Sequence, residues 1–159
     1  MAFISWVSRV EFMQLPKFSL PASDGNTYSD KDWADKNIVL YLYPKDATPG
    51  CTLEANAFQK LYTAFKTADF QVFGLSTDSV TSHENFCHSE GLKFPLLADE
   101  KGDLINALGS WVEKSLFGKN YMSTDRSTFI IASGKVVQEW RAVKPAGHAE
   151  EVLEFCKNY

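Results

Sequence analysis

The chain has 159 residues, 45% of them hydrophobic and 23% charged, which suits one domain with a single core and excludes a disordered chain. Twenty acidic against 16 basic residues give a net charge of −4, and without a basic cluster this argues against nucleic acid as a partner. Because no apolar run approaches the ~20 residues of a membrane-spanning helix and the N-terminus lacks a basic signal-peptide start, we expect no membrane partner and a cytoplasmic location.

The cysteines and histidines form neither a disulfide framework nor a metal-ligand pattern. Three cysteines are an odd number, and none stands in a Cys-x-x-Cys pair. A zinc site needs about four ligands. The candidate ligands show no paired spacing: Cys51, Cys87, Cys156, His83, His88 and His148. We therefore expect no metal.

The first assignable elements are short. Residues 18–28 predict brief strands around the Asp24-Gly25 turn, and residues 29–36 are polar, with Trp33 docking a brief helix. Residues 37–43 form an apolar run rich in β-branched and aromatic types, which Pro44 ends, and this predicts a buried strand.

A helix begins after the loop that follows this strand. Thr48 is the expected N-cap and Pro49 the first helical residue, which places Cys51 on the first turn. Helix N-termini and nearby cations lower the pKa of a cysteine, which is about 8.5 when unperturbed, and so create a nucleophile. The alternative is a buried, inert cysteine, but a first-turn position away from the apolar face argues against it. That face is formed by Ala57, Phe58, Leu61, Tyr62 and Phe65.

The next segments continue the alternation of strand and helix. Residues 71–77 predict a second strand, parallel to the first because a helix separates them. Residues 78–90 predict a helix that Asp78 or Ser79 caps and Gly91 ends. A strand-like segment at 94–98, a turn at 99–102 and a short helix at 103–108 follow.

The last third predicts a hairpin and a closing helix. We expect residues 109–125 to form a long, packed loop, because they show no clear periodicity. Residues 127–132 and 135–140 flank a Ser-Gly turn as a hairpin. The apolar face of the closing helix contains Ala149, Val152, Leu153 and Cys156, of which the cysteine is expected to be structural. A βαβ half followed by ββα predicts an α/β, thioredoxin-like fold with a central mixed sheet flanked by helices.

One motif in this sequence resembles a known family. Pro44-x-x-x-Thr48-x-x-Cys51 is similar to the active-site signature of the peroxiredoxins, and the string from residue 43 to 55 resembles their bacterioferritin-comigratory, or Q-type, branch. The resemblance extends from about residue 15 to the C-terminus, so we expect a single peroxiredoxin domain at 15–159. Residues 1–14 would then be an extension: an extra strand, an interaction segment or a misassigned start.

The resemblance implies catalytic roles for four residues. Cys51 would attack the peroxide, Thr48 would present its hydroxyl to it, Arg126 would hold the thiolate and orient the substrate, and Pro44 would shield the sulfur. Taken alone, Thr48 is explained as a helix cap and Arg126 as a solvated charge. Glu54 matches the branch's Cys-Thr-x-Glu string, although an exposed first-turn carboxylate explains it nearly as well.

Two interpretations are open for the cysteine that would resolve the sulfenic acid. Many Q-type enzymes place a resolving cysteine five residues after the first, where this chain has Asn56. A subset resolves from the next helix, which makes Cys87 the candidate, although a face shared with Val80 and His83 also suits a core cysteine. His83 would either stabilise a Cys87 thiolate or be a partly buried or surface histidine.

The activity that the resemblance implies is reduction of hydrogen peroxide and small organic hydroperoxides. Cys51 would become a sulfenic acid, Cys87 would resolve it as an intramolecular disulfide, and thioredoxin or a similar thiol reductant would recycle it. The resemblance also implies a monomer without metal, haem or flavin. Two alternatives stay open: an external thiol resolves Cys51, or the chain is a peroxide sensor or binding module.

Overall fold

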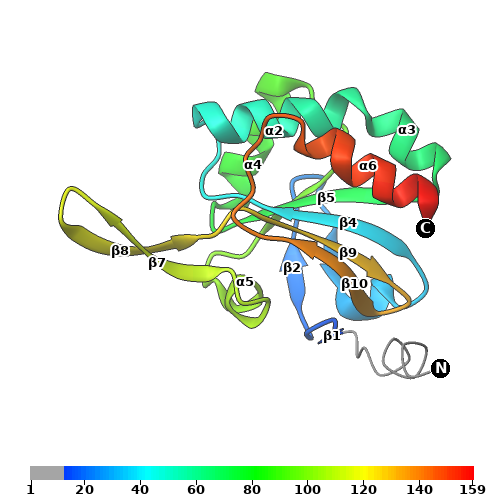
Figure 1. The fold of residues 1–159 in the computed structure, drawn as a ribbon, viewed down its shortest axis with the longest axis horizontal. Coiled ribbons are helices and arrows are strands. Elements are labelled where there is room, and N and C mark those ends of the chain that lie inside the picture. The colour runs from blue at the N-terminus through cyan, green and yellow to red at the C-terminus, as the bar shows by residue number, and fades with distance from the viewer. Residues whose placement is uncertain (1–12) are drawn as a thin grey trace, which may run out of the picture.

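The computed structural model describes residues 13–159, which form a mixed six-stranded sheet between two layers (Figure 1). The strand order is β1-β10-β9-β4-β5-β6. Strands β4, β5 and β6 are parallel, and β9 runs antiparallel to β4. The bounds are Met13–Gln14 (β1), Asn37–Leu42 (β4), Gln71–Ser76 (β5), Leu96–Ala98 (β6), Ser127–Ala132 (β9) and Lys135–Trp140 (β10). The expected α/β, thioredoxin-like fold is confirmed.

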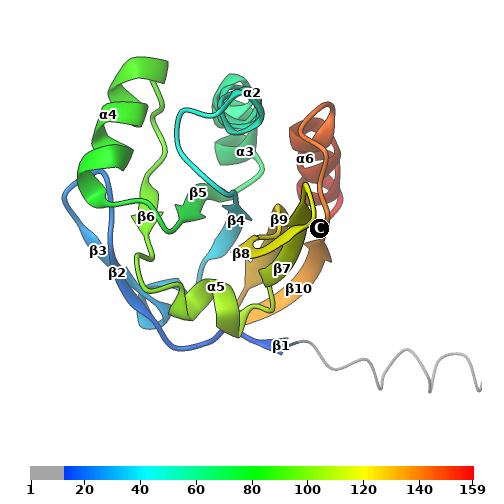
Figure 2. The same cartoon turned by 90° about the vertical axis from the view of Figure 1, so that its left-hand side faces the viewer.

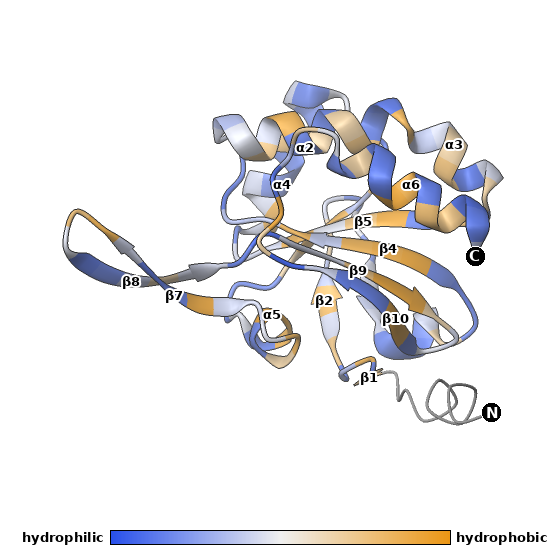
Figure 3. Cartoon of the chain, viewed as in Figure 1, coloured by the Kyte–Doolittle hydropathy of each residue, from blue (hydrophilic) through white to orange (hydrophobic). Residues whose placement is uncertain are grey.

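Both faces of the sheet are covered, which explains why β4 is apolar at every position after its first. Alternate side chains of a strand point to opposite faces, and those of β4 divide between two hydrophobic clusters. Figure 3 shows β4 and β9 as largely hydrophobic ribbons. Four helices cover one face of the sheet: α2 (Pro49–Lys60), α3 (Tyr62–Thr67), α4 (Val80–Glu90) and α6 (His148–Asn158). Shorter elements cover the other face: η1 (Asp30–Trp33), α5 (Asp103–Ala107) and the hairpin of β2 (Ser19–Pro21) and β3 (Thr27–Ser29) (Figure 2).

One glycine on β5 makes room for an aromatic ring of the central strand. A Cβ at Gly74 would lie 2.5 Å from Leu96 and 3.2 Å from the Tyr41 ring. That ring stacks on Phe58 of α2, with centroids 4.6 Å apart. This close approach therefore fixes α2 over the sheet, and the predicted nucleophile, Cys51, lies on the first turn of α2.

The helix that follows β5 begins and ends as the sequence predicts. The side chain of Ser79 caps α4 by accepting a hydrogen bond from the backbone N–H of Ser82. Gly91 ends the helix in the left-handed conformation, with φ +67°.

The prediction of a long loop at 109–125 is wrong, because most of this segment is a β-hairpin. β7 (Trp111–Leu116) pairs with β8 (Lys119–Thr124), and the hairpin projects from the end of the molecule where α2 begins (Figures 1 and 2). Many of its side chains are exposed, so the sequence lacks the alternation of apolar and polar residues that indicates a half-buried strand. Phe117 and Gly118 both have positive φ, as a tight hairpin turn requires, but phenylalanine before the glycine is not the usual signal.

The N-terminal extension is described only at its last two residues. Met13 and Gln14 form β1, which pairs with Val136 and Lys135 at the edge of the sheet. The rest of the extension lies outside the described residues, so the division into 1–14 and 15–159 stays a prediction. Within residues 13–159, no helix is long and apolar enough to cross a bilayer.

Candidate active site

The site begins at the junction of β4 and α2. Thr48 has an extended backbone as the N-cap residue, Pro49 is the first helical residue, and Cys51 is therefore on the first turn, as predicted. The backbone N–H of Thr52 closes this turn on the Thr48 carbonyl at 2.8 Å. Backbone N–H groups of a first turn have no partner within the helix, so their partial positive charge surrounds the cysteine.

The side chain of Thr48 does not cap the helix. Its Oγ1 donates a hydrogen bond to the Lys45 carbonyl oxygen at 2.7 Å, and it makes no cap bond to the helix N–H groups. Because the hydroxyl hydrogen is used in the loop, the oxygen remains able to accept a hydrogen bond from a bound molecule.

Arg126 joins Cys51 and Glu54 across two elements that are far apart in the sequence. It lies just before β9, and its Nη2 is 3.4 Å from the Cys51 sulfur while its Nη1 is 2.7 Å from Glu54 Oε1. A Cβ at Gly50 would lie 3.3 Å from this guanidinium, so glycine there permits the close approach. The arginine is therefore not the solvated charge that its position alone suggests.

Cys51 is buried, contrary to the expectation from its first-turn position. It is 2% exposed and belongs to the hydrophobic cluster between α2 and the sheet. Burial disfavours the charged form of arginine, but Glu54 and Cys51 outweigh it and hold the pKa of Arg126 above its usual value. The cysteine thus meets a permanent cation in a site from which most water is excluded.

Glu54 is also buried, so its interpretation as an exposed first-turn carboxylate is wrong. Glu54 is 0% exposed. Burial raises the pKa of its carboxyl group to about 7, although the charge of Arg126 acts in the opposite direction. Its Oε2 and the Tyr41 hydroxyl have no hydrogen-bond partner within residues 13–159. Burial, and after it the charge of Glu54, raises the pKa of Tyr41 well above its usual value.

Cys87 lies on α4 in a different environment. Its sulfur is 3.4 Å from Ser23 Oγ, and the residue packs against the same hydrophobic cluster as Cys51. Burial raises the pKa of this thiol; the bond with Ser23 lowers it, and the charges of Asp46 and Asp24 raise it further. All three cysteines are free thiols.

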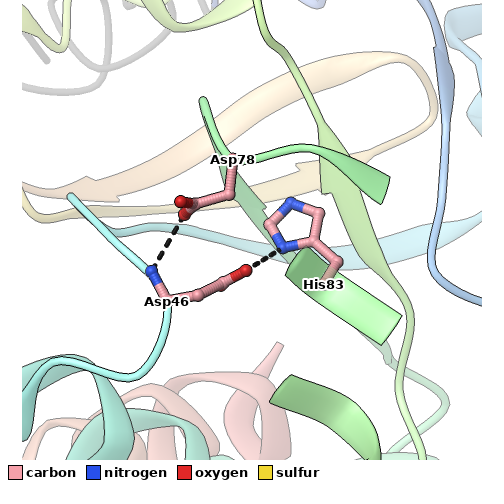
Figure 4. Close-up of side chains that lie close together, drawn as sticks. All are labelled: Asp46, Asp78 and His83. Carbon is pink, nitrogen blue, oxygen red and sulfur yellow. Dashed lines mark hydrogen bonds and ion pairs between the residues drawn. The ribbon is translucent and has the colours of Figure 1, made fainter. Parts of the chain in front are cut away.

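His83 is fully buried and pairs with Asp46 rather than with Cys87. Its Nδ1 is 2.7 Å from Asp46 Oδ2 and its Nε2 is 2.9 Å from the Leu97 carbonyl oxygen. Asp46, Asp78 and His83 bring ligand atoms within 4.8 Å of one another. Figure 4 shows the three side chains, with hydrogen bonds that link Asp46 to each of the other two. Both ring nitrogens already contact protein oxygens, so this donor set fits a hydrogen-bond network better than a cation site.

The two remaining candidates support the fold. Cys156 is buried, and burial raises its pKa to about 12, as suits the structural role predicted for it. His148, to which no role was assigned from sequence, is 6% exposed, and its Nε2 lies 2.7 Å from Thr128 Oγ1 on β9. The pKa of His148 is lowered, chiefly by burial; the charge of Glu151 opposes this shift and that of Arg126 adds to it.

The arrangement unites the parts that cleavage of an O–O bond needs. A buried sulfur supplies the nucleophile, a guanidinium stabilises the charge that develops, and a hydroxyl on the preceding turn can hold the substrate. Sequence reasoning missed Asp46 as a partner of α4, because nothing local indicates a contact between residues 37 apart.

Comparisons with known proteins agree with this geometry. The model of the AhpC/TSA family matches residues 13–140. Peroxiredoxin Bcp of Xanthomonas campestris is 43% identical over 150 residues, which are 91% of this chain and 94% of that protein. Peroxiredoxin Bcp of Bacillus subtilis is 41% identical over 144 residues, covering 90% and 92%.

Solved structures give the same result. A structure of Xanthomonas campestris peroxiredoxin Q superposes with a TM-score of 0.85 and 42% identity, over 89% of this chain and 90% of that one. Another, of the bacterioferritin comigratory protein of the same organism, was described for its alkyl peroxide reduction activity. The chain therefore belongs to the AhpC/TSA family, as a peroxiredoxin of the bacterioferritin-comigratory, or Q-type, branch, and is a thiol peroxidase.

Proposed function

We propose that Cys51 reduces hydrogen peroxide and small organic hydroperoxides with the help of Thr48, Arg126 and Pro44. The thiolate attacks the hydroxyl oxygen of ROOH: an S–O bond forms, the O–O bond breaks, and RO⁻ takes a proton from solvent to become ROH. Cys51 is oxidised to a sulfenic acid and the peroxide is reduced by two electrons. The observation that carries this proposal is the 3.4 Å contact between Arg126 and the Cys51 sulfur.

Each assisting residue has a physical reason for its role. Arg126 places its cation 3.4 Å from the sulfur and neutralises the charge that develops on the departing oxygen. Thr48 Oγ1 accepts the hydroperoxide hydrogen, because its own hydrogen is bound to Lys45. Pro44, half-buried just after β4, has no N–H and shields the sulfur from water. The activity named for the relative from Xanthomonas campestris makes alkyl hydroperoxides the first organic substrates to test.

We further propose that Cys87 resolves the sulfenic acid. Its sulfur attacks that of Cys51, an S–S bond forms, the S–O bond breaks, and hydroxide leaves with the thiol proton as water. Both residues contact one hydrophobic cluster, but from separate helices. A disulfide requires Cα atoms about 4.4–6.8 Å apart, a condition that cysteines on separate helices need not meet in the reduced fold. We therefore infer that the first turn of α2, part of α4, or both unwind in each cycle. Thioredoxin then restores both thiols by exchange.

Two experiments test these steps. Peptide mass spectrometry after peroxide treatment and non-reducing digestion should find a Cys51–Cys87 disulfide. Turnover with thioredoxin and its reductase should collapse in Cys87→Ser. If turnover persists in that variant, an external thiol resolves Cys51; if the wild type consumes only one equivalent of peroxide, it is a sensor rather than a recycling enzyme.

The remaining proposals concern the state of the protein. The family resemblance favours a monomer, which light scattering would check against the chain mass of 17.9 kDa. Free cysteines, odd in number, suit the reducing cytoplasm. Fractionation of cells that make the protein tests the compartment directly.

A further inference from the structure

A buried polar network joins the loop before Cys51 to the helix that contains Cys87. Asp46 lies in the loop, and its carboxylate accepts hydrogen bonds from the Tyr43 hydroxyl at 2.6 Å, Ser82 Oγ at 2.8 Å and His83 Nδ1 at 2.7 Å. Its backbone N–H donates to Asp78 Oδ2 at 2.9 Å, just before α4 (Figure 4). The first turn of α4 is thus fastened to the active-site loop at several points.

The hydrogen-bond pattern shows how the central pair, Asp46 and His83, is held together. A carbonyl oxygen only accepts, so His83 Nε2 must donate its proton to Leu97. Burial raises the pKa of Asp46, but the bonds from His83 and Tyr43 outweigh it and lower the pKa, so the carboxylate is ionised and Nδ1 also donates. The side chains of His83 and Asp46 are 0% and 4% exposed, so neither has water as an alternative partner. Removing His83 therefore strands the charge of the carboxylate.

Phe86, the next buried residue of α4, packs in the core, but the polar contacts of the helix beyond it are weaker. Beyond His83, the sulfur of Cys87 has a long neutral contact with Ser23, and Glu90 accepts an exposed hydrogen bond from Asn56 at 3.0 Å. The helix then ends at Gly91. Exposed bonds, and long bonds between neutral groups, open at lower free energy than short, buried bonds to a charged group, so the last turn of α4 is the part expected to unwind.

We propose that Asp46 and His83 are positioning residues, which keep the first turn of α4 attached to the active-site loop while the turn with Cys87 opens. This inference rests on the proposed resolving role of Cys87. His83 precedes Cys87 by four residues, or about 6 Å of helix. The opened segment therefore remains tethered at His83 to the loop that precedes Cys51. This tether keeps Cys87 within a short distance of the sulfenic acid.

The test separates the two chemical steps in the full-length, reduced protein. After rapid mixing with hydrogen peroxide, samples are quenched with a sulfenic-acid trap and a thiol alkylator, and intact mass spectrometry counts sulfenic acid and disulfide. In His83→Gln the amide can reach Leu97 but not Asp46, whereas in His83→Asn it can reach Asp46. His88→Asn is the matched control, because His88 is exposed on the same helix.

The expected result is a split between the two rates. Loss of the charged hydrogen bond in His83→Gln should slow disulfide formation about 10- to 100-fold while oxidation of Cys51 changes less than about threefold. His83→Asn should recover most of the lost rate, and His88→Asn should match the wild type. Ser82→Ala removes one hydrogen bond to Asp46 but leaves His83 in place. It should slow only the disulfide step, and it tests the inference even if the His83 variants fail to fold.

Three outcomes would overturn the inference. A folded His83→Gln that forms the disulfide at the wild-type rate refutes it, and so does an equal slowing of both steps, which indicates a merely structural role. If instead the wild type itself forms no Cys51–Cys87 disulfide, the proposed role of Cys87 fails first. Cys87→Ser, mixed in the same way, distinguishes that case: if Cys87 resolves Cys51, the sulfenic acid persists in the variant but not in the wild type, and if it does not, the two proteins behave alike.

Discussion

The two cysteines that face one hydrophobic cluster occupy opposite electrostatic environments. Cys51 sits on the first turn of a helix, 3.4 Å from a guanidinium. Cys87 lies in the second half of α4, where burial and the charges of Asp46 and Asp24 raise its pKa. Cys51 is the more buried of the two, so exposure does not decide which sulfur reacts first.

This contrast gives a physical reason for the different roles that we propose for the two cysteines. The N–H groups of a helix start and a fixed cation favour a thiolate, whereas nearby carboxylates disfavour it. A thiol that stays protonated does not compete for peroxide and is preserved for attack on the sulfenic acid. The predictions below disturb one side of the contrast at a time.

The largest effect is expected from removing the cation. Arg126→Met keeps much of the side-chain volume but not the charge, and should lower kcat/KM for hydrogen peroxide by about 100- to 1,000-fold. Arg141→Met is the matched control, since Arg141 bonds to the Leu108 and Gly109 carbonyls away from Cys51. A folded Arg126→Met that stays within threefold of the wild type would contradict the role of the arginine.

The hydroxyl of Thr48 should have the next largest effect. Thr48→Val preserves the shape but removes the group that accepts the hydroperoxide hydrogen, and should lower kcat/KM by about 10- to 100-fold. Thr48→Ser should restore most of the rate. Thr52→Val, one turn further along α2, should behave as the wild type; an equal loss in both valine variants would indicate a helix effect instead.

Replacing Glu54 should change the pH dependence of stability. In the native state its pKa is about 7, so between about pH 4.5 and 7 it keeps a proton that the unfolded chain has lost. The free energy of unfolding therefore falls as pH rises through this window, by about 1–3 kcal/mol from this group. In urea titrations at pH 5 and pH 8, Glu54→Gln should lack that decline.

Glu84→Gln changes an exposed carboxylate on α4 and is the control for the Glu54 variant. Its stability should follow the wild type at both pH values. If the difference between Glu54→Gln and the wild type is the same at pH 5 and pH 8, Glu54 does not titrate in this window.

The smallest effect is expected at the third cysteine. Cys156 is buried on α6 and contacts neither Arg126 nor a helix start. Cys156→Ala should leave turnover within twofold and cost about 1–2 kcal/mol of stability through the cavity that it creates. Loss of turnover in this variant would mean that Cys156 takes part in the redox cycle.

Periodicity and capping signals predict most of the fold. The apolar run at 37–43, the capped helix at 78–90 and the closing helix all stand near their predicted positions, because buried faces leave a periodic trace. The β7–β8 hairpin was missed for the converse reason, since a strand exposed on both sides has no such trace.

Long-range contacts at the site leave less information in the sequence. The first-turn position of Cys51 follows from Thr48 and Pro49, but its burial depends on how α2 lies against the sheet. The ion pair of Glu54 joins residues 72 apart, and that of Asp46 joins residues 37 apart. Such pairs arise only when strands and helices meet, so their partners cannot be read from local patterns.

Alkylation of the reduced protein at pH 5.5 tests the central claim most directly. With limiting iodoacetamide and peptide mass spectrometry, Cys51 should react at least about tenfold faster than Cys87 and Cys156, because only its thiolate is favoured by a cation and a helix start. Arg126→Met should remove most of this advantage. If Cys51 reacts no faster than Cys87 in the wild type, the account of the site is contradicted.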